Sequence, residues 1–488
     1  MRNHAMPSHS WARFLPRPEF QILMPAVLLA ACAAPAALNS QPGDIVKSVD
    51  QRDLSHIDVG EVIEIARLEA IELPLPSAED LADPAQKGYW QACAYTWNPA
   101  VRASRRGLES AVALAESAGA PSPMSFQAML NQASGGSGLL VGQSSVELTR
   151  LLGMGPSAAE RELATTEVLE ATVGLELALW NAGFAVERSR VTLAAVRARY
   201  SALDKLNRDL REDRVRLKIL NDHGRLPAAA WEGVEARTAA LDAAVSRLHV
   251  LEKTAESMLS RASGLPMGHP SLAVPAWNQI PHENLDAGSW PQNEELLARH
   301  PLLRVRRISL SIAEAQLREV ASKAWPSIRL GVETGLNPAT LPFAGLLSLQ
   351  WPFPSSWRGK LEAAEARRAR QLERIEESYL DQIARVDQAH ATYENALIKH
   401  HLYSPSMEWG AEAMWRASRA RLHEGLEPMS EWFDFFDKRL GSVHLVMDAW
   451  EYEQLSRIGL QKELGPGSSN SRPVQPSEPV SEVTLWTQ

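Results

Sequence analysis

One turn sequence occurs twice in the chain, 201 residues apart (425 − 224). The stretches GRLPAAAW at 224–231 and GLEPMSEW at 425–432 carry glycine, proline and tryptophan at the same spacing. Glycine can end a helix in the left-handed conformation, and proline suits the first turn of the helix that follows. Each stretch therefore predicts a turn between two antiparallel helices. The residues that define the two turns are Gly224, Pro227, Gly425 and Pro428.

Other landmarks recur at nearly the same offset. Pro99 opens one alanine-rich amphipathic stretch, and Pro301 opens another 202 residues later (301 − 99). Gly264 closes the first copy and Gly465 closes the second, again 201 residues apart (465 − 264). Landmarks that keep their order and their offset predict two tandem copies of a unit of about two hundred residues, which is too long for a solenoid repeat.

These landmarks divide the chain into predicted segments. They are a signal peptide (1–31), an N-terminal linker (32–85), repeat 1 (86–265), an inter-repeat linker (266–290), repeat 2 (291–465) and a tail (466–488). The tail is rich in serine and proline, a composition that predicts disorder. The N-terminal linker contains a short amphipathic stretch to which we assign no role.

Each copy is predicted to contain a very long helix. No proline interrupts residues 157–220, and a helix of roughly 60 residues extends on the order of 90 Å. Apolar side chains at steps of three and four residues suit coiled-coil packing. These are Val173, Leu177, Trp180 and Phe184. In the second copy the helix starts near Ser356 and is interrupted near Pro405, which has no counterpart in the first.

The periodicity changes from helical to a period of two between the helices of each copy. Residues 328–336 alternate between apolar and polar side chains, and after a short turn residues 347–351 alternate again. Such alternation indicates β-strands with one apolar face. It predicts a hairpin at about 326–353, and a looser pattern predicts another at about 123–152. The fold class is therefore mainly α with a small β part, in which each repeat has long antiparallel coiled-coil helices and one β-hairpin.

Tryptophans gather at one end of the second hairpin. Trp325 precedes its outgoing strand, and Trp351 and Trp357 follow its returning strand. Tryptophan side chains are enriched at membrane–water interfaces, where they lie at one depth. Strands of about ten residues match the length that a tilted strand needs to cross a bilayer. Because four strands cannot close a barrel and lipid tolerates no open edges, several chains would have to contribute. The alternative is a small solvent-facing sheet packed on the helices.

The N-terminus carries an export signal. Basic residues precede the short apolar segment QILMPAVLLA, and LAAC ends it at Cys32. This pattern is similar to the lipobox of bacterial lipoproteins, whose cysteine is acylated after cleavage, and Ala33 in the next position implies sorting to the outer membrane. The alternative is a plain secretory signal. Cys93, the other cysteine, has apolar neighbours and no partner for a disulfide, which predicts a buried and inert thiol.

Charge and motifs exclude several classes of function. A net charge of −9 and a pI near 5.9 argue against nucleic-acid binding, which needs a basic surface. The sequence contains neither a phosphate-binding loop nor a nucleophile elbow, and its histidines do not have metal-ligand spacing. We therefore predict no enzyme, no cofactor and no metal. After the signal segment, no apolar run is long enough for a membrane-spanning helix.

The ordered set of landmarks resembles the TolC family of outer-membrane efflux proteins over about residues 85–465. The helix starts NP and HP, the proline-led hairpins, the glycine turns and the passage AGLLSLQWPFPSSWRGKLEAAEARR carry the resemblance. It implies a homotrimer, with a hollow α-helical barrel in the periplasm and a shared twelve-stranded β-barrel in outer-membrane lipid. The glycine turns at the tip would dock a periplasmic adaptor protein attached to an inner-membrane pump. The chain would then be the lipid-anchored exit duct of a tripartite efflux or secretion system.

The resemblance also implies a constriction of the channel. The family places acidic residues after the second turn, facing the channel axis, and the matching positions are Glu431 and Asp434. Three copies of each would form an anionic ring that disfavours anions and binds cations. The alternative is a pair of solvated charges near a helix start, where carboxylates are favoured anyway. The first copy has Ala230 where the second has Glu431, so any charged gate is expected to come from the second copy.

A second function is compatible with the same helices. A lipid-anchored periplasmic coiled-coil adaptor or spacer protein, with no pore, would also need long helical hairpins. The β-hairpins discriminate between the two functions, because a spacer needs neither lipid-facing strands nor a level of tryptophans.

Overall fold

The computed structural model describes residues 86–118, 125–132, 138–147, 156–268, 276–277, 280, 299–323, 327–335, 344–350 and 354–466. Cys32, Trp325 and Trp351 lie outside these ranges. The same holds for the predicted signal peptide, the N-terminal linker and all but the first residue of the predicted tail.

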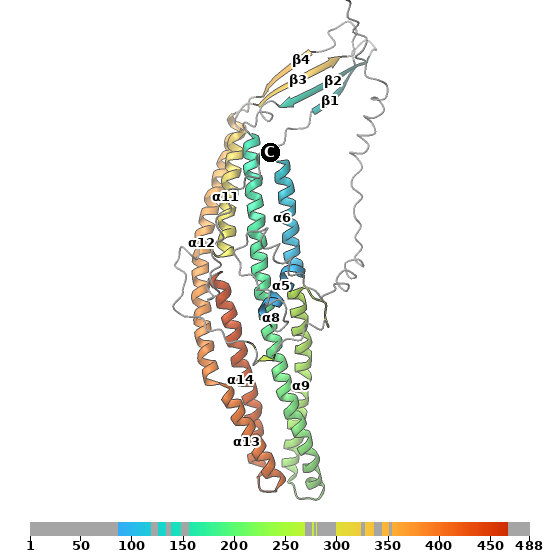
Figure 1. Cartoon of the computed structure of the whole chain (residues 1–488), viewed down its shortest axis with the longest axis vertical. Helices are drawn as coiled ribbons and strands as arrows, with labels where there is room; N and C mark the ends of the chain where they lie inside the picture. The colour runs from blue at the N-terminus through green and yellow to red at the C-terminus, as the bar shows by residue number, and fades with distance from the viewer. Residues whose placement is uncertain are drawn as a thin grey trace, which may run out of the picture. The chain divides into compact units, whose positions relative to one another are not determined.

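Long helices account for most of the described residues (Figure 1). They are α5 (Lys87–Trp97), α6 (Pro99–Ser117), α8 (Pro156–Asp222), α9 (Ala228–Ser263), α11 (Pro301–Ser322), α12 (Pro354–Leu402), α13 (Pro405–His423) and α14 (Met429–Leu464). The 67 residues of α8 extend about 100 Å, which confirms the predicted long helix of the first copy. The interruption predicted at Pro405 is also confirmed, because α12 ends at Leu402 and proline begins α13. None of the described helices is both long enough and apolar enough to cross a membrane.

The two predicted helix starts at Pro99 and Pro301 are confirmed, because each proline occupies the first turn of its helix, α6 or α11. Asn98 caps α6, since its side-chain oxygen accepts a hydrogen bond from the backbone N–H of Ala100 at 2.9 Å. Its side-chain amide donates to the carbonyl oxygen of Ala262 at 2.7 Å. One side chain therefore caps α6 and fastens it to the end of α9.

The returning helices α9 and α14 have 36 residues each. The residues that follow them are Gly264 and Gly465, with φ angles of 76° and 84°. At Gly264 the absence of a side chain is also a packing requirement, because a Cβ atom there would lie 2.4 Å from the carbonyl oxygen of Trp97. Glycine thus lets the end of α9 approach the end of α5.

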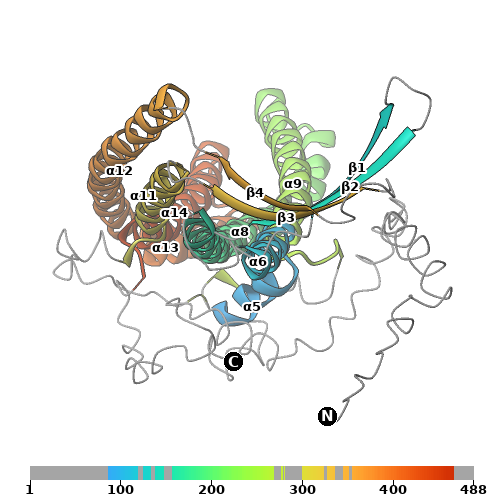
Figure 2. The same ribbon diagram turned by 90° about the horizontal axis from the view of Figure 1, so that it is seen from above.

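The strands are β1 (Ser125–Gln132), β2 (Gly138–Glu147), β3 (Ser327–Gly335) and β4 (Ala344–Gln350). They form one antiparallel sheet in the order β1-β2-β3-β4, and Figure 2 shows them side by side. The central pairing places Val141 of β2 opposite Gly335 of β3. Both predicted hairpins are therefore present, and they pair directly with each other although they lie far apart in the sequence.

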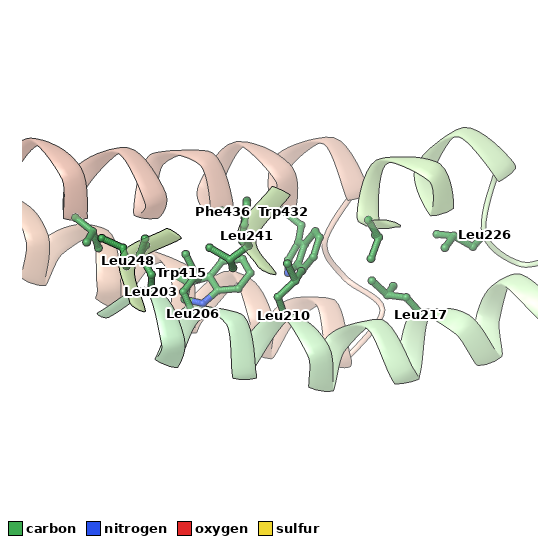
Figure 3. Close-up of a cluster of buried hydrophobic side chains, with 12 residues drawn as sticks. Leu203, Leu206, Leu210, Leu217, Leu226, Leu241, Leu248, Trp415, Trp432 and Phe436 are labelled. Carbon is green, nitrogen blue, oxygen red and sulfur yellow. The ribbon is translucent and has the colours of Figure 1, made fainter. Parts of the chain in front are cut away.

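The helix α8 is central to the packing, since α5, α6, α9, α11 and α14 all contact it. Its buried leucines recur at steps of three, four and seven residues, as in a coiled coil. The core that they form with neighbouring helices (Figure 3) contains Leu203, Leu206, Leu210 and Leu217 of α8, Leu241 and Leu248 of α9, Trp415 of α13, and Trp432 and Phe436 of α14. Each such side chain contributes about 1.5–3 kcal/mol when it is fully buried.

The apolar stripe predicted on the upper part of α8 is confirmed only in part. Val173 and Trp180 are buried, whereas Leu177 and Phe184 are half-buried. Leu175, which does not belong to that stripe, is 1% exposed. Helices contact α8 on several sides, and its buried surface is therefore wider than a single coiled-coil seam.

Candidate functional site

The two repeated turns have the same backbone conformation. Gly224 and Gly425 adopt φ angles of 68° and 74°, and nothing lies within 4 Å of the position a Cβ atom would take in either. The N–H of Arg225 donates to the carbonyl of Leu220 at 2.8 Å, and the matching bond of the second turn joins Leu426 to Arg421 at 2.9 Å. These 6→1 bonds end α8 and α13 in the same way, as the sequence predicts.

The prolines of the turns stand one position earlier than expected. Pro227 and Pro428 lie just before α9 and α14, in extended conformation with ψ angles of 138° and 142°. Each carbonyl accepts the first helical hydrogen bond, from Trp231 and Trp432 respectively, at 3.1 Å. Proline therefore occupies the N-cap and not the first turn, because an N-cap residue is extended and has no need to donate its own N–H.

One buried position distinguishes the two turns. Leu226 of the first turn lies in the hydrophobic core, and its counterpart in the second turn is Glu427, whose side chain is only 2% exposed. Arg421 pairs with the Glu427 carboxylate at 2.7 Å, and the hydroxyl of Ser418 donates to it at 3.1 Å. The second turn is therefore fastened by a buried ion pair where the first is fastened by apolar packing.

The predicted constriction residues follow the second turn on α14. Glu431 and Asp434 are both exposed, and among the described residues neither carboxylate forms a hydrogen bond or an ion pair. They stand three residues apart, so their side chains lie on neighbouring positions of one helix face. Nothing else in the described chain neutralises them, and their role in a constriction stays a prediction.

One of the two matching positions in the first copy is closely packed. Its counterparts of Glu431 and Asp434 are Ala230 and Gly233, and a Cβ atom at Gly233 would lie 2.8 Å from the ring of Phe433. Phe433 belongs to α14, so the bare backbone of α9 lets the two helices meet at this level. A side chain at position 233 would require the Phe433 ring to move.

Comparisons with known proteins agree with this geometry. Residues 293–434 match the family model of outer membrane efflux proteins, a segment that includes Glu431 and ends at Asp434. The structure of the outer-membrane channel OprN matches with a TM-score of 0.65 and 18% identity, covering 80% of this chain and 92% of that chain. The chain has the fold of this outer-membrane channel.

Two further outer-membrane protein structures have the same fold. The outer membrane protein VceC from Vibrio cholerae matches with a TM-score of 0.62 and 15% identity, over 79% of this chain and 97% of that chain. The open state of the MtrE outer membrane channel from Neisseria gonorrhoeae matches with a TM-score of 0.65 and 16% identity, over 79% and 90%. No curated protein matches the chain. The resemblance predicted from the sequence is thus confirmed at the level of the fold.

A charged cluster that sequence reasoning missed joins α8 and α13 near the turns. The Asp213 carboxylate is fully buried, and Arg419 binds it at 2.8 Å. His423 contacts the same carboxylate at 2.9 Å, and Arg419 also pairs with Asp209 at 2.9 Å. From the sequence alone, each of these charged residues would be expected to be exposed and solvated. Their pairing depends on α8 and α13 lying side by side, which no local pattern encodes.

A second cluster lies on the same pair of helices. Glu412 of α13 pairs with Lys205 of α8 at 2.5 Å, with Arg416 at 2.7 Å, and with the buried Arg439 of α14 at 2.9 Å. Burial alone would raise the pKa of Glu412, but the hydrogen bonds from Lys205 and Arg416 and the charge of Arg439 outweigh it and lower the pKa to about 2. The carboxylate therefore stays ionised and ties three helices together.

The remaining candidate residues are placed as follows. Trp357 is half-buried in the first turn of α12, seven residues after the end of β4 at Gln350 (357 − 350). Cys93 is buried, as predicted, and burial raises the pKa of its thiol to about 12. A thiol with so high a pKa is unreactive at neutral pH. Among the described residues, no group of three or more histidine, cysteine and carboxylate side chains is arranged to hold a metal ion.

Proposed function

We propose that the chain is the outer-membrane channel of a tripartite efflux or secretion system. In this role it receives substrate from an inner-membrane pump and a periplasmic adaptor and passes it to the exterior. The observation that carries the proposal is the match to outer-membrane channel and protein structures over about four-fifths of the chain. The match of residues 293–434 to the family model of outer membrane efflux proteins is a second supporting observation.

The sheet supports an assembly of several copies. Among the described strands, β1 pairs only with β2 and β4 only with β3, so each outer strand has one unpaired edge. Lipid does not tolerate such edges. Three copies that pair β4 of one chain with β1 of the next would close twelve strands into a barrel, which is the homotrimer we propose. The duplicated architecture would place two hairpins from each chain in that barrel.

Two exposed helix faces fit the same assembly. Small side chains cover an outer face of α9 and an outer face of α13, and small side chains let helices approach closely. On α9 they are Ala236, Ala239, Ala240 and Ala243, and on α13 they are Gly410, Ala413, Ala417 and Ala420, all exposed in the single chain. Beside the α13 face, Trp409 is 72% exposed. We propose that α9 of one copy packs against α13 of the next.

The membrane attachment follows from the sequence alone. We propose that residues 1–31 are removed, that Cys32 is acylated, and that Trp325, Trp351 and Trp357 lie at a membrane interface. The turns at Gly224, Pro227, Gly425 and Pro428 would form the periplasmic tip that contacts the adaptor. Their shared backbone geometry supports this role, because it presents the two turns of each chain as equivalent surfaces.

The oligomeric state in detergent tests this proposal. Light scattering of the purified protein is expected to give three times the mass of one chain. Ala413→Glu, which places a charge in the α13 face, is expected to yield monomers, and Ala413→Ser, which keeps the side chain small, is expected to keep the trimer. A Cys32→Ser protein that is a stable monomer without detergent would contradict the channel and support the adaptor or spacer function.

A further inference from the structure

A cation lies on the same helix face as the two predicted constriction residues. Lys438 stands four residues after Asp434 and seven after Glu431, so on a helix its direction falls between theirs. All three are exposed. The next position on this face seven residues further on is Leu445, which is exposed and uncharged. Two acids and one lysine therefore form a compact charged set at the start of α14.

Lys438 is not neutralised by a carboxylate of the described chain. Its ammonium group lies 5.3 Å from the centre of the Phe435 ring, a cation–π contact that positions the charge and leaves it intact. The ammonium group of Lys438 is thus left without a carboxylate partner among the described residues, on an exposed part of α14.

The first copy treats the equivalent cation differently. The residue 201 positions earlier is Arg237, which pairs with Asp437 of α14 at 2.6 Å and lies 4.1 Å from the centre of the Phe433 ring. Arg237 is therefore used to join α9 to α14, while Lys438 is left facing outward. At this duplicated position, Arg237 of the first copy forms an ion pair between helices, whereas Lys438 of the second copy forms none with a described residue.

We propose that Lys438 is a selectivity-determining residue, forming a cationic ring about one helical turn beyond the anionic ring of Asp434 and two beyond that of Glu431. The inference rests on the proposed function, because only a three-fold channel turns three side chains into rings. In that channel, six carboxylates and three ammonium groups would face the axis in successive layers. Lys438 would then limit the preference for cations that the two acids create.

The expected size follows from the spacing along the helix. Four residues separate Asp434 and Lys438 by about 6 Å along the axis, which is within the Debye length of about 10 Å at 0.1 M salt. A permeating ion at the Asp434 level therefore senses the lysine. After screening, each unit charge removed at this distance in water changes the ratio of cation to anion permeability about threefold. A substitution at position 438 removes three charges in the trimer, so together they change the ratio by up to about thirtyfold.

Reversal potentials of single channels in a KCl gradient test the inference. The variants are Lys438→Gln, Lys438→Arg, the double variant Glu431→Gln with Asp434→Asn, and the control Lys253→Gln, which removes an exposed lysine of α9. Lys438→Gln is expected to raise cation preference by about threefold to about thirtyfold, because the trimer loses three charges. Lys438→Arg and the control are expected to match the unmodified protein, and the double variant is expected to shift toward anions.

The outcomes separate this inference from the channel itself. If the unmodified protein conducts and the double variant shifts while Lys438→Gln does not, the cationic ring is refuted and the anionic ring stands. If Lys438→Arg shifts as much as Lys438→Gln, the effect comes from packing and not from charge, which also overturns the inference. If the unmodified protein forms no channel at all, the proposed function fails and this inference fails with it.

Discussion

Glu412 gives the clearest quantitative prediction, because its environment makes helix packing depend on pH. Its side chain is 15% exposed and contacts Lys205, Arg416 and Arg439. Its pKa is about 2, against an ordinary value of 4.5 for a glutamate. A carboxylate whose pKa is lowered by folding stabilises the protein above its unfolded pKa, and that stability is lost as pH falls toward the folded value. The window for Glu412 therefore extends from about pH 4.5 down to about pH 2.

The size follows from linkage. A difference of 2.5 between the two pKa values corresponds to about 3 kcal/mol at pH 7, or about 300-fold in the equilibrium for local opening. At pH 3 the same relation leaves about 1.4 kcal/mol, or tenfold. Glu412→Gln keeps the shape of the side chain and removes its charge. The variant is therefore expected to open α13 about 300-fold more often at pH 7 and about tenfold more often at pH 3.

Hydrogen exchange of α13 backbone amides measures this difference, because local opening governs their exchange. Unmodified protein and variant are compared at each pH, so that the intrinsic exchange rate cancels. A matched control is Glu362→Gln, whose partner Arg358 is 79% exposed and whose loss is expected to cost no more than about 0.5 kcal/mol. Equal exchange in both proteins, or a difference of the same size at pH 7 and pH 3, would refute the linkage.

Two further predictions concern glycines and the buried pair of the second turn. Gly224→Ala is expected to destabilise the fold by about 1 kcal/mol. Gly264→Ala is expected to cost several kcal/mol more, because only its new Cβ atom would collide with the backbone of Trp97. Thermal unfolding of both variants measures this difference, and equal losses of stability would contradict it. Arg421→Ala leaves the Glu427 carboxylate buried without its cation and is expected to lower the free energy of unfolding by about 3 kcal/mol. Glu427→Leu, which copies the first turn, is expected to cost less than half of that. If urea unfolding ranks the two variants in the opposite order, the ion pair does not stabilise this turn.

The parts of the fold that were predictable depend on short stretches of sequence. A glycine and a proline three positions apart determine each turn within a few residues, and the absence of proline over residues 157–220 permits one uninterrupted helix. Alternation with a period of two likewise marks a strand from its own residues. The displacement of Pro227 and Pro428 to the N-cap was missed because both positions accept proline, and helix boundaries are uncertain by a residue or two.

The parts that were not predictable depend on which helices lie side by side. Arg419 and Asp213 are 206 residues apart in the sequence, and nothing near either residue names the other. Gly233 looks like a weak point in a helix until the ring of Phe433 is found against it. Exposure of Glu431 and Asp434 agrees with the predicted constriction, but their direction toward an axis depends on neighbouring copies.

Single-channel recording tests the central claim most directly. Protein purified as a trimer in detergent and added to a planar lipid bilayer is expected to give discrete conductance steps, and Glu431→Gln combined with Asp434→Asn should change their ion preference. A stable monomer that produces no conductance under conditions where a known efflux channel does would contradict the account. Such a result would leave a lipid-anchored coiled-coil protein without a pore.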